Sequence, residues 1–225
     1  MAEEFLAVEA KFELLRPMLP ESKLFSNFNK NHYEAHGFQL LRITLLIDCI
    51  KDAVKVVLER GKKSPSLKCL MAMLANESIR EQIKNDYSNI RVIYEEPLAP
   101  NIENIINKSE NIQEEKRKKI FEKKYSQLEK SWAELETSNL SSKLKGIRNK
   151  VAAHLEITKN GQSYRLRDIS DFGLDWTDLE KFLNIAKPLI FEIALLTCFT
   201  NYDLDGNLEI HRKISSSFWG AFKSS

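Results

Sequence analysis

The stretch from Asn31 to Glu59 constrains the fold most, because its apolar residues recur at the spacing of an α-helix. This pattern predicts a long amphipathic helix that ends at Gly61. A helix with one apolar face needs other elements to cover that face. The apolar stripe consists of Leu40, Ile43, Leu46, Ile47, Ile50, Val54, Val57 and Leu58.

Helix-forming residues also dominate the rest of the chain, which has only 7 Gly and 6 Pro among 225 residues. Breaks at Pro17/Pro20, Gly61 and Pro97/Pro100 separate the helical segments. We therefore expect an all-α helical bundle. The other expected helices cover residues 3–15, 65–86 with Ser64 as N-cap, 101–137, 140–155 after a cap within "TSN", and 177–200, which begins at a Thr177/Glu180 capping box.

Strand content is expected only around Asn160-Gly161, which lies between two short runs of alternating residues. Asn-Gly is typical of a two-residue β-turn, so we predict one small β-hairpin near residues 156–167. A chain of 225 residues has the size of a single domain. We assign its core to about residues 31–200 and expect the C-terminal tail, residues 201–225, to pack on that core.

Charge and cysteine content narrow the class of protein. The 34 basic and 32 acidic side chains nearly cancel, so any attraction to nucleic acid must come from a local patch. Neither a secretory signal nor an apolar segment long enough for a membrane span is visible. The three cysteines have no pairing or ligand spacing. We therefore expect a cytoplasmic protein without membrane association.

The charged run "EEKRKKIFEKKY" lies within the expected helix at 101–137. Two interpretations are open for it, a solvated helix face and a platform for RNA. We favour the solvated face, because charge runs on helices are usually exposed to water.

The segment "KLKGIRNKVAAHLE", residues 143–156, combines an apolar stripe with polar residues at its edges. On a helical wheel at ~100° per residue, His154 and Arg148 bracket the stripe, with about 120° of turn and about 9 Å of rise between them. The two side chains cannot easily meet within one helix. A second copy across a two-fold axis would bring them together, which predicts a homodimer. The stripe consists of Leu140, Leu144, Ile147, Val151 and Leu155.

The same segment is locally basic. No acidic residue occurs between Thr137 and Glu156. In a nearly neutral chain, such a patch favours phosphate groups. Spacing alone also leaves open a structural role, with His154 at the edge of the core and Arg148 capping a neighbouring helix. The basic residues are Lys143, Lys145, Arg148 and Lys150.

The segment "IRNKVAAH", residues 147–154, resembles the Arg-Asn-x-x-x-x-His motif of the HEPN superfamily. The flanking segments "HGFQLLRITLLIDCIKD" (36–52) and "DFGLDWTDLEKFL" (171–183) are similar to its AbiU-type abortive-infection branch. The resemblance covers about residues 31–200. Proteins of this kind are typically metal-independent endoribonucleases or toxins, and they act as homodimers with the motif at the two-fold axis. The resemblance implies catalytic roles for Arg148, Asn149 and His154.

These residue types suit RNA cleavage by attack of the 2′-hydroxyl on the adjacent phosphate. Histidine titrates near neutrality, so the two His154 side chains of a dimer can divide the base and acid roles. Arg148 can bind the phosphate oxygens, and Asn149 can orient the histidine or hold the substrate. Lys143, Lys145 and Lys150 are the candidate RNA-binding lysines.

No metal or other cofactor is needed for this chemistry. His32 and His36 lie one helical turn apart, but no third ligand stands nearby at a suitable spacing.

One departure from the family concerns Glu156. Some members that are paired with a nucleotidyltransferase antitoxin carry a Tyr at this position, two residues beyond the His, where it is modified. Silencing by that modification is therefore in doubt, and an antitoxin or another regulatory protein stays open as a partner.

We predict a dimeric HEPN endoribonuclease that acts on RNA in phage defence or growth arrest. Two alternatives stay open. The first is a non-catalytic HEPN module that binds RNA or a protein. The second is a structural dimer in which His154 and Arg148 make hydrogen bonds at the interface.

Overall fold

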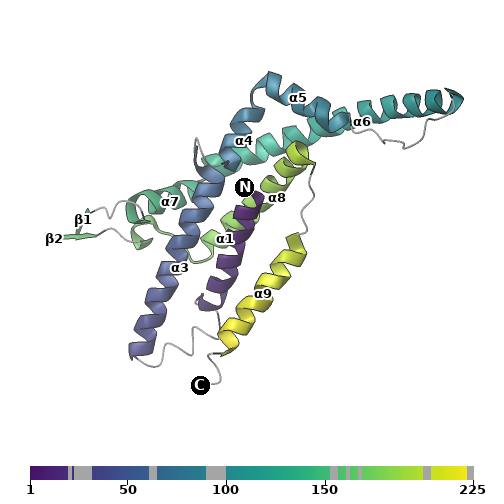
Figure 1. Cartoon of the computed structure of the whole chain (residues 1–225). Helices are drawn as coiled ribbons and strands as arrows, with labels where there is room; N and C mark the ends of the chain where they lie inside the picture. The colour runs from purple at the N-terminus through teal and green to yellow at the C-terminus, as the bar shows by residue number, and fades with distance from the viewer. Residues whose placement is uncertain are drawn as a thin grey trace.

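The computed structural model describes residues 1–19, 22, 32–60, 65–89, 100–152, 157–160, 163–166, 169–199 and 204–221. Within these ranges the chain is helical apart from two short strands (Figure 1). The all-α architecture is therefore confirmed. Among the helices described, none combines the length and the apolar character that crossing a membrane requires.

The elements follow one another along the chain with few residues between most of them. They are α1 (Ala2–Leu15), the 3₁₀ turn η1 (Arg16–Met18), α3 (His32–Leu58), α4 (Leu67–Leu74), α5 (Glu77–Ser88), α6 (Pro100–Thr137), α7 (Asn139–Ile147), the π-helical segment η2 (Arg148–Ala152), β1 (Ile157–Asn160), β2 (Ser163–Leu166), the 3₁₀ turn η3 (Ile169–Phe172), α8 (Asp178–Cys198) and α9 (Leu204–Ala221).

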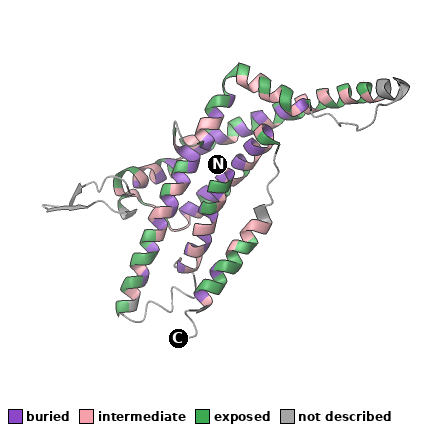
Figure 2. Ribbon diagram, viewed as in Figure 1, coloured by how far each residue is buried: buried purple, intermediate pink, exposed green. Residues whose placement is uncertain are grey.

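Helix α3 is the long helix that the first apolar stripe predicts. Its C-terminal half lies in the core, where α1, α4, α7 and α8 contact it and where Leu46 and Ile50 are almost fully buried. Its N-terminal half is largely exposed (Figure 2), and Leu40 of the same stripe keeps 63% of its surface in water. Periodicity thus predicts the helix, but it does not predict where the covering elements stop.

One continuous cluster of apolar side chains joins α1, α3, α4, α6, α7 and α8, and it includes Trp219 of α9. Phe5, Phe121 and Phe182 are its largest fully buried members. Burial of a side chain of this size contributes about 1.5–3 kcal/mol to the stability of the fold.

The single helix expected at residues 65–86 is wrong. Asn76 ends it, because its side chain accepts hydrogen bonds from the backbone N–H groups of Ser78 at 3.1 Å and Ile79 at 3.3 Å and so caps a new helix. The N-cap of α4 is Ser66, whose hydroxyl accepts from the backbone N–H of Cys69. The expected cap, Ser64, lies outside the described residues.

The capping box expected at Thr177 and Glu180 is also wrong, because the Thr177 side chain makes no capping hydrogen bond. Two aspartates fix the start of α8 instead. Asp178 Oδ2 accepts from the backbone N–H of Asp175 at 3.0 Å, and Asp175 Oδ1 accepts from that of Thr177 at 3.3 Å.

The expected C-terminal tail is largely a helix, α9, which lies beside α1 (Figure 1). Trp219 Nε1 donates to the carbonyl of Leu14 at 2.9 Å, and the Ser215 hydroxyl donates to the carbonyl of Glu13 at 2.7 Å. The neighbouring Phe218 stays 49% exposed. Residues 222–225 lie outside the described part of the chain.

Strands β1 and β2 pair antiparallel, with Asn160 opposite Ser163 and Ile157 opposite Leu166. This short ladder falls within residues 156–167, where the Asn-Gly dipeptide predicts a hairpin. Gly161 and Gln162, between the strands, lie outside the described residues.

Candidate functional site

The three segments that carry the family resemblance contact one another around α7. From α3, the Arg42 guanidinium lies over the ring of Trp176, 3.9 Å from its centroid. From the stretch before α8, the ring of Phe172 lies so close to Gly146 that a Cβ there would stand 2.7 Å from Cε1. Gly146 thus permits a close approach of η3 to α7, just before the motif. Segments distant in sequence therefore form one local unit.

The apolar stripe of α7 is covered within the chain. Ser138 begins the helix by accepting a hydrogen bond from the backbone N–H of Ser141 at 3.0 Å. Leu144 and Ile147 are fully buried, because α3, α6 and α8 contact this helix. The expectation that the stripe partly faces a second copy is therefore wrong for these two residues. These two residues give no support to a homodimer, which stays a prediction.

At Arg148 the α-helix changes into the π-helical segment η2, whose sequence is "RNKVA". π-Helical hydrogen bonds run from residue i to i+5, and such segments are frequent at functional sites. The helical wheel that positions His154 assumes ~100° per residue, and that assumption fails over Arg148–Ala152. His154 itself lies outside the described residues, as do Ala153, Leu155 and Glu156.

Arg148 is half-buried at the start of this segment and makes two contacts. Its Nη2 forms an ion pair with Oε1 of Glu59, the residue that follows the end of α3. Its Nη1 donates to Oδ1 of Asn149 at 2.9 Å. The side chains of Arg148 and Glu59 remain 34% and 29% exposed, although Oε1 of Glu59, which makes the ion pair, is itself buried.

Glu59 is the site residue that sequence reasoning missed. It lies at the end of the helix predicted at 31–59, and nothing in the local sequence distinguishes it from other surface glutamates. Only the contact between α3 and η2 brings it to Arg148.

The three lysines expected to bind RNA differ in their exposure and in their contacts. Lys143 donates to the carbonyl of Gly173 at 2.6 Å and lies 3.5 Å from Oδ2 of Asp178. Lys145 is half-buried and Lys150 is exposed. Because Arg148 and Lys143 both face carboxylates from other elements, the positive patch is weaker than the acid-free sequence suggests.

The carboxyl group of Asp178 responds to these cations. Burial by itself raises its pKa, but the hydrogen bond from the backbone of Asp175 and the positive charges of Lys181 and Lys143 outweigh burial and lower the pKa. Asp178 therefore stays charged at neutral pH and fixes Lys143 near the start of α8.

Within the described residues the candidate site thus consists of the half-buried Arg148 and the exposed Asn149, joined by a hydrogen bond where α7 ends. Among the residues described, no three His, Cys, Asp or Glu side chains stand close enough together to hold a metal ion. His36 is exposed on α3, and the side chain of His32 lies outside the description.

Comparison with known proteins gives one match. A family model of the HEPN type, described as AbiU2, matches residues 2–212. The match extends from α1 into α9, beyond the range 31–200 at both ends. No curated protein and no solved structure matches significantly.

Proposed function

The chain belongs to the AbiU2 family of HEPN proteins, and on that premise we propose that it is a metal-independent endoribonuclease acting in phage defence, by abortive infection, or in growth arrest. The observation that carries this proposal is the placement of Arg148. The first residue of the motif is half-exposed, is held by Glu59 and Asn149, and stands where the helix becomes π-helical.

In the proposed reaction, the 2′-hydroxyl of the RNA attacks the adjacent phosphorus while the bond to the 5′-oxygen breaks. A base removes the hydroxyl proton, and an acid protonates the departing 5′-oxygen. Arg148 stabilises the negative charge that grows on the phosphate oxygens. The product is a 2′,3′-cyclic phosphate on one fragment and a free 5′-hydroxyl on the other.

The geometry of Arg148 is compatible with that role. A guanidinium has five N–H donors; Nη1 donates one of them to Asn149, and Nη2 forms the ion pair with Glu59. Donors therefore remain for a phosphate while Glu59 keeps the group oriented. The role assigned to Glu59 is to position Arg148, not to react with the RNA.

The remaining parts of the proposal combine the family resemblance with the charge pattern and composition of the chain. His154 from each of two subunits supplies the base and the acid, which requires a homodimer, and Lys145 and Lys150 bind the RNA near the cut. The protein acts in the cytoplasm, and an antitoxin or regulatory protein restrains it. The apolar cluster that joins α1 to α8 supports one domain over residues 1–225.

A second candidate is a non-catalytic HEPN module that binds RNA or a protein. The ion pair between Arg148 and Glu59 favours the non-catalytic alternative, because a carboxylate partner reduces the positive charge available to stabilise the transition state. Catalysis and mere binding differ in whether the RNA is cut.

The test uses purified wild type, His154→Ala and, as a matched control, His36→Ala, which removes an exposed histidine of α3. Each is incubated with end-labelled RNA in EDTA after its mass and helicity are matched to the wild type. We expect cleavage to cyclic phosphate ends by the wild type and His36→Ala only. Equal cutting by all three would rule out His154, and RNA binding without cutting would favour the binding module.

A further inference from the structure

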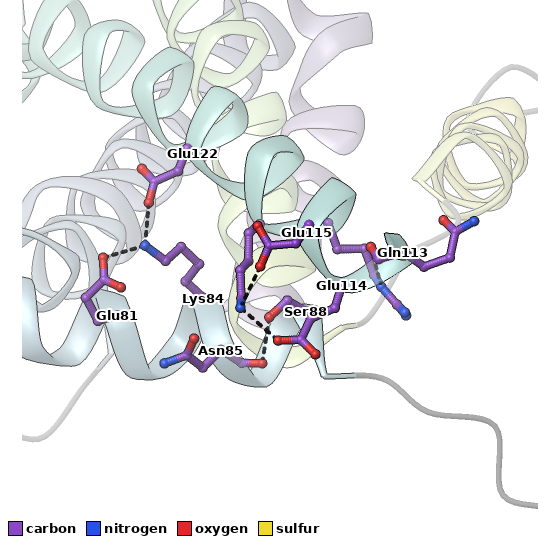
Figure 3. A network of polar contacts seen from close by, with 10 residues as sticks. Glu81, Lys84, Asn85, Ser88, Gln113, Glu114, Glu115 and Glu122 are labelled. Atoms are coloured by element: carbon purple, nitrogen blue, oxygen red, sulfur yellow. Dashed lines mark hydrogen bonds and ion pairs between the residues drawn. The ribbon is translucent and has the colours of Figure 1, made fainter. Parts of the chain in front are cut away.

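Helix α6 carries two kinds of lysine. Those that face other helices, or lie beside carboxylates, form ion pairs: Lys118 lies 2.8 Å from Glu114, and Lys124 lies 2.5 Å from Glu192 of α8. On the side facing α5, Lys84 of that helix bridges Glu81 and Glu122 (Figure 3). The hydrogen bonds that Lys118 and Lys84 donate to these carboxylates hold the pKa of both lysines above the ordinary value.

The second kind lies on the solvent side of α6 and forms what we call the α6 lysine row. Its members are exposed, and none has a carboxylate partner among the residues that the structure describes. At ~100° per residue they fall within about 60° of arc, and at ~1.5 Å per residue they span about 21 Å. The row consists of Lys116, Lys119, Lys123 and Lys130.

Two of the carboxylates near the row are engaged by other lysines. Glu115 contacts Lys118 at 3.2 Å, and Glu122 contacts Lys84 at 2.9 Å, so both are engaged elsewhere. Glu134, exposed one turn beyond Lys130, bounds the row at its C-terminal end. Ile120 lies at its edge and is 45% exposed.

An uncompensated row of this kind has an energetic cost. Like charges three or four residues apart destabilise a helix by about 0.2–0.5 kcal/mol per pair. Lys119 stands at these spacings from both Lys116 and Lys123. A polyanion lying along the row would remove the repulsion. Lys118 and Lys124 of the same helix form ion pairs with glutamates. The lack of carboxylate partners is therefore specific to the row and is not a general property of α6.

We propose that the α6 lysine row binds the sugar-phosphate backbone of single-stranded RNA, at a distance from the motif. Lysine is a compact, mobile charge that suits phosphates without reading sequence. The row leads along α6 toward Ser138, after which α7 leads to the motif residues in η2. This inference rests on the proposed function, because it assigns a second contact to the same substrate. It replaces the interpretation of the charged run as only a solvated face.

The test compares two variants that lose the same formal charge, both in a His154→Ala background so that the RNA stays intact. One is K116Q/K119Q/K123Q/K130Q. The matched control replaces four lysines that each have a carboxylate partner: Lys51, Lys118, Lys181 and Lys213, all to Gln. Helicity is matched by circular dichroism. Binding of a labelled single-stranded RNA is measured by fluorescence anisotropy between about 50 and 200 mM NaCl.

We expect the row variant to bind at least about tenfold more weakly at the lowest salt, and its log–log salt slope to be shallower by about 3, at roughly 0.7 per lost contact. The control should bind like its parent. Equal losses of affinity in both variants would show that only net charge matters, which would overturn the inference. No loss of affinity in the row variant would overturn it too. No RNA binding by the parent would overturn it as well. A wild type that binds through the row but never cuts RNA would refute the nuclease and leave the row standing.

Discussion

Helix α3 pairs its carboxylates with cations from two other parts of the chain, and the two contacts differ in kind. In its middle, Asp48 and Asp52 both lie 2.5 Å from Nζ of Lys11 of α1. Just beyond its end, Glu59 pairs with Arg148 of η2. The first contact joins two regular helices, and the second holds a residue at the point where helix geometry changes.

The difference shows that an ion pair can stabilise the fold at one position and orient a candidate site residue at another. Lys11 has one compact charge with two carboxylates on it, and hydrogen bonds to Asp48 and Asp52 hold its pKa well above the ordinary value. Arg148 has one carboxylate and an amide, so part of its guanidinium remains available. Under the proposed function, Lys11 serves the stability of the fold and Arg148 contacts the RNA.

The largest expected effect is that of Arg148→Lys. The substitution keeps the positive charge but loses the planar set of donors that can contact Glu59, Asn149 and a phosphate together. We expect the rate of RNA cleavage to fall about 100-fold, with a melting temperature close to that of the wild type. Single-turnover cleavage and thermal unfolding monitored by circular dichroism measure the two quantities. An unchanged rate would mean that only charge matters at this position.

Glu59→Gln should have a smaller effect. The amide removes the charge that orients Arg148 but preserves the size of the side chain, so we expect cleavage to slow about tenfold, mainly in kcat. The control is Glu81→Gln, which removes a carboxylate from the Lys84 cluster far from the motif. Faster cleavage by Glu59→Gln would show instead that Glu59 restrains Arg148.

Lys11→Met tests the other contact. The side chains of Lys11, Asp48 and Asp52 are each about a third or more exposed, so solvent screening keeps the contribution of these ion pairs to stability small. We expect the free energy of unfolding to fall by about 0.5–1 kcal/mol and the cleavage rate to stay unchanged. Urea unfolding at neutral pH gives the first quantity. Loss of cleavage in a stably folded Lys11→Met protein would break the division between the two contacts.

The smallest effect is one of pH. The hydrogen bond from Lys11, followed by smaller charge effects, lowers the pKa of Asp48 below its ordinary 3.8. A lowered carboxyl pKa stabilises the folded state above the ordinary pKa, and that stabilisation disappears as pH falls through the lowered value. The difference in unfolding free energy between wild type and Asp48→Asn should therefore be smaller at pH 3 than at pH 7. A constant difference would contradict the role of this charge.

Sequence patterns predict the long helices well, because periodicity and the Pro and Gly breaks are local properties. Helices α1, α3 and α6 begin and end within one or two residues of the expected positions. The start of α5 depends on one hydrogen-bonding side chain, Asn76, inside an otherwise helical stretch. Trp219 and Ser215 hydrogen-bond α9 to α1, a contact that no local pattern reveals.

The candidate site likewise has one part that the local sequence predicts and another part that depends on contacts between distant segments. The motif identifies Arg148 and Asn149, and the structure brings these two together. The partner of Arg148 depends on a contact between distant segments, and the π-helical turn has no signature in the local sequence. The buried stripe of α7 shows that amphipathic spacing tells which residues are covered, but not whether the cover comes from the same chain.

RNA cleavage by Arg148→Ala, measured beside Lys11→Ala, tests the central claim most directly. Both variants lose a cation that pairs with a carboxylate on or next to α3. The account predicts that Arg148→Ala loses about 100- to 1,000-fold in cleavage rate with little change in melting temperature, whereas Lys11→Ala melts earlier and cuts at the wild-type rate. Cleavage by Arg148→Ala at the wild-type rate, or its loss only through unfolding, would contradict the assignment of Arg148 to the reaction.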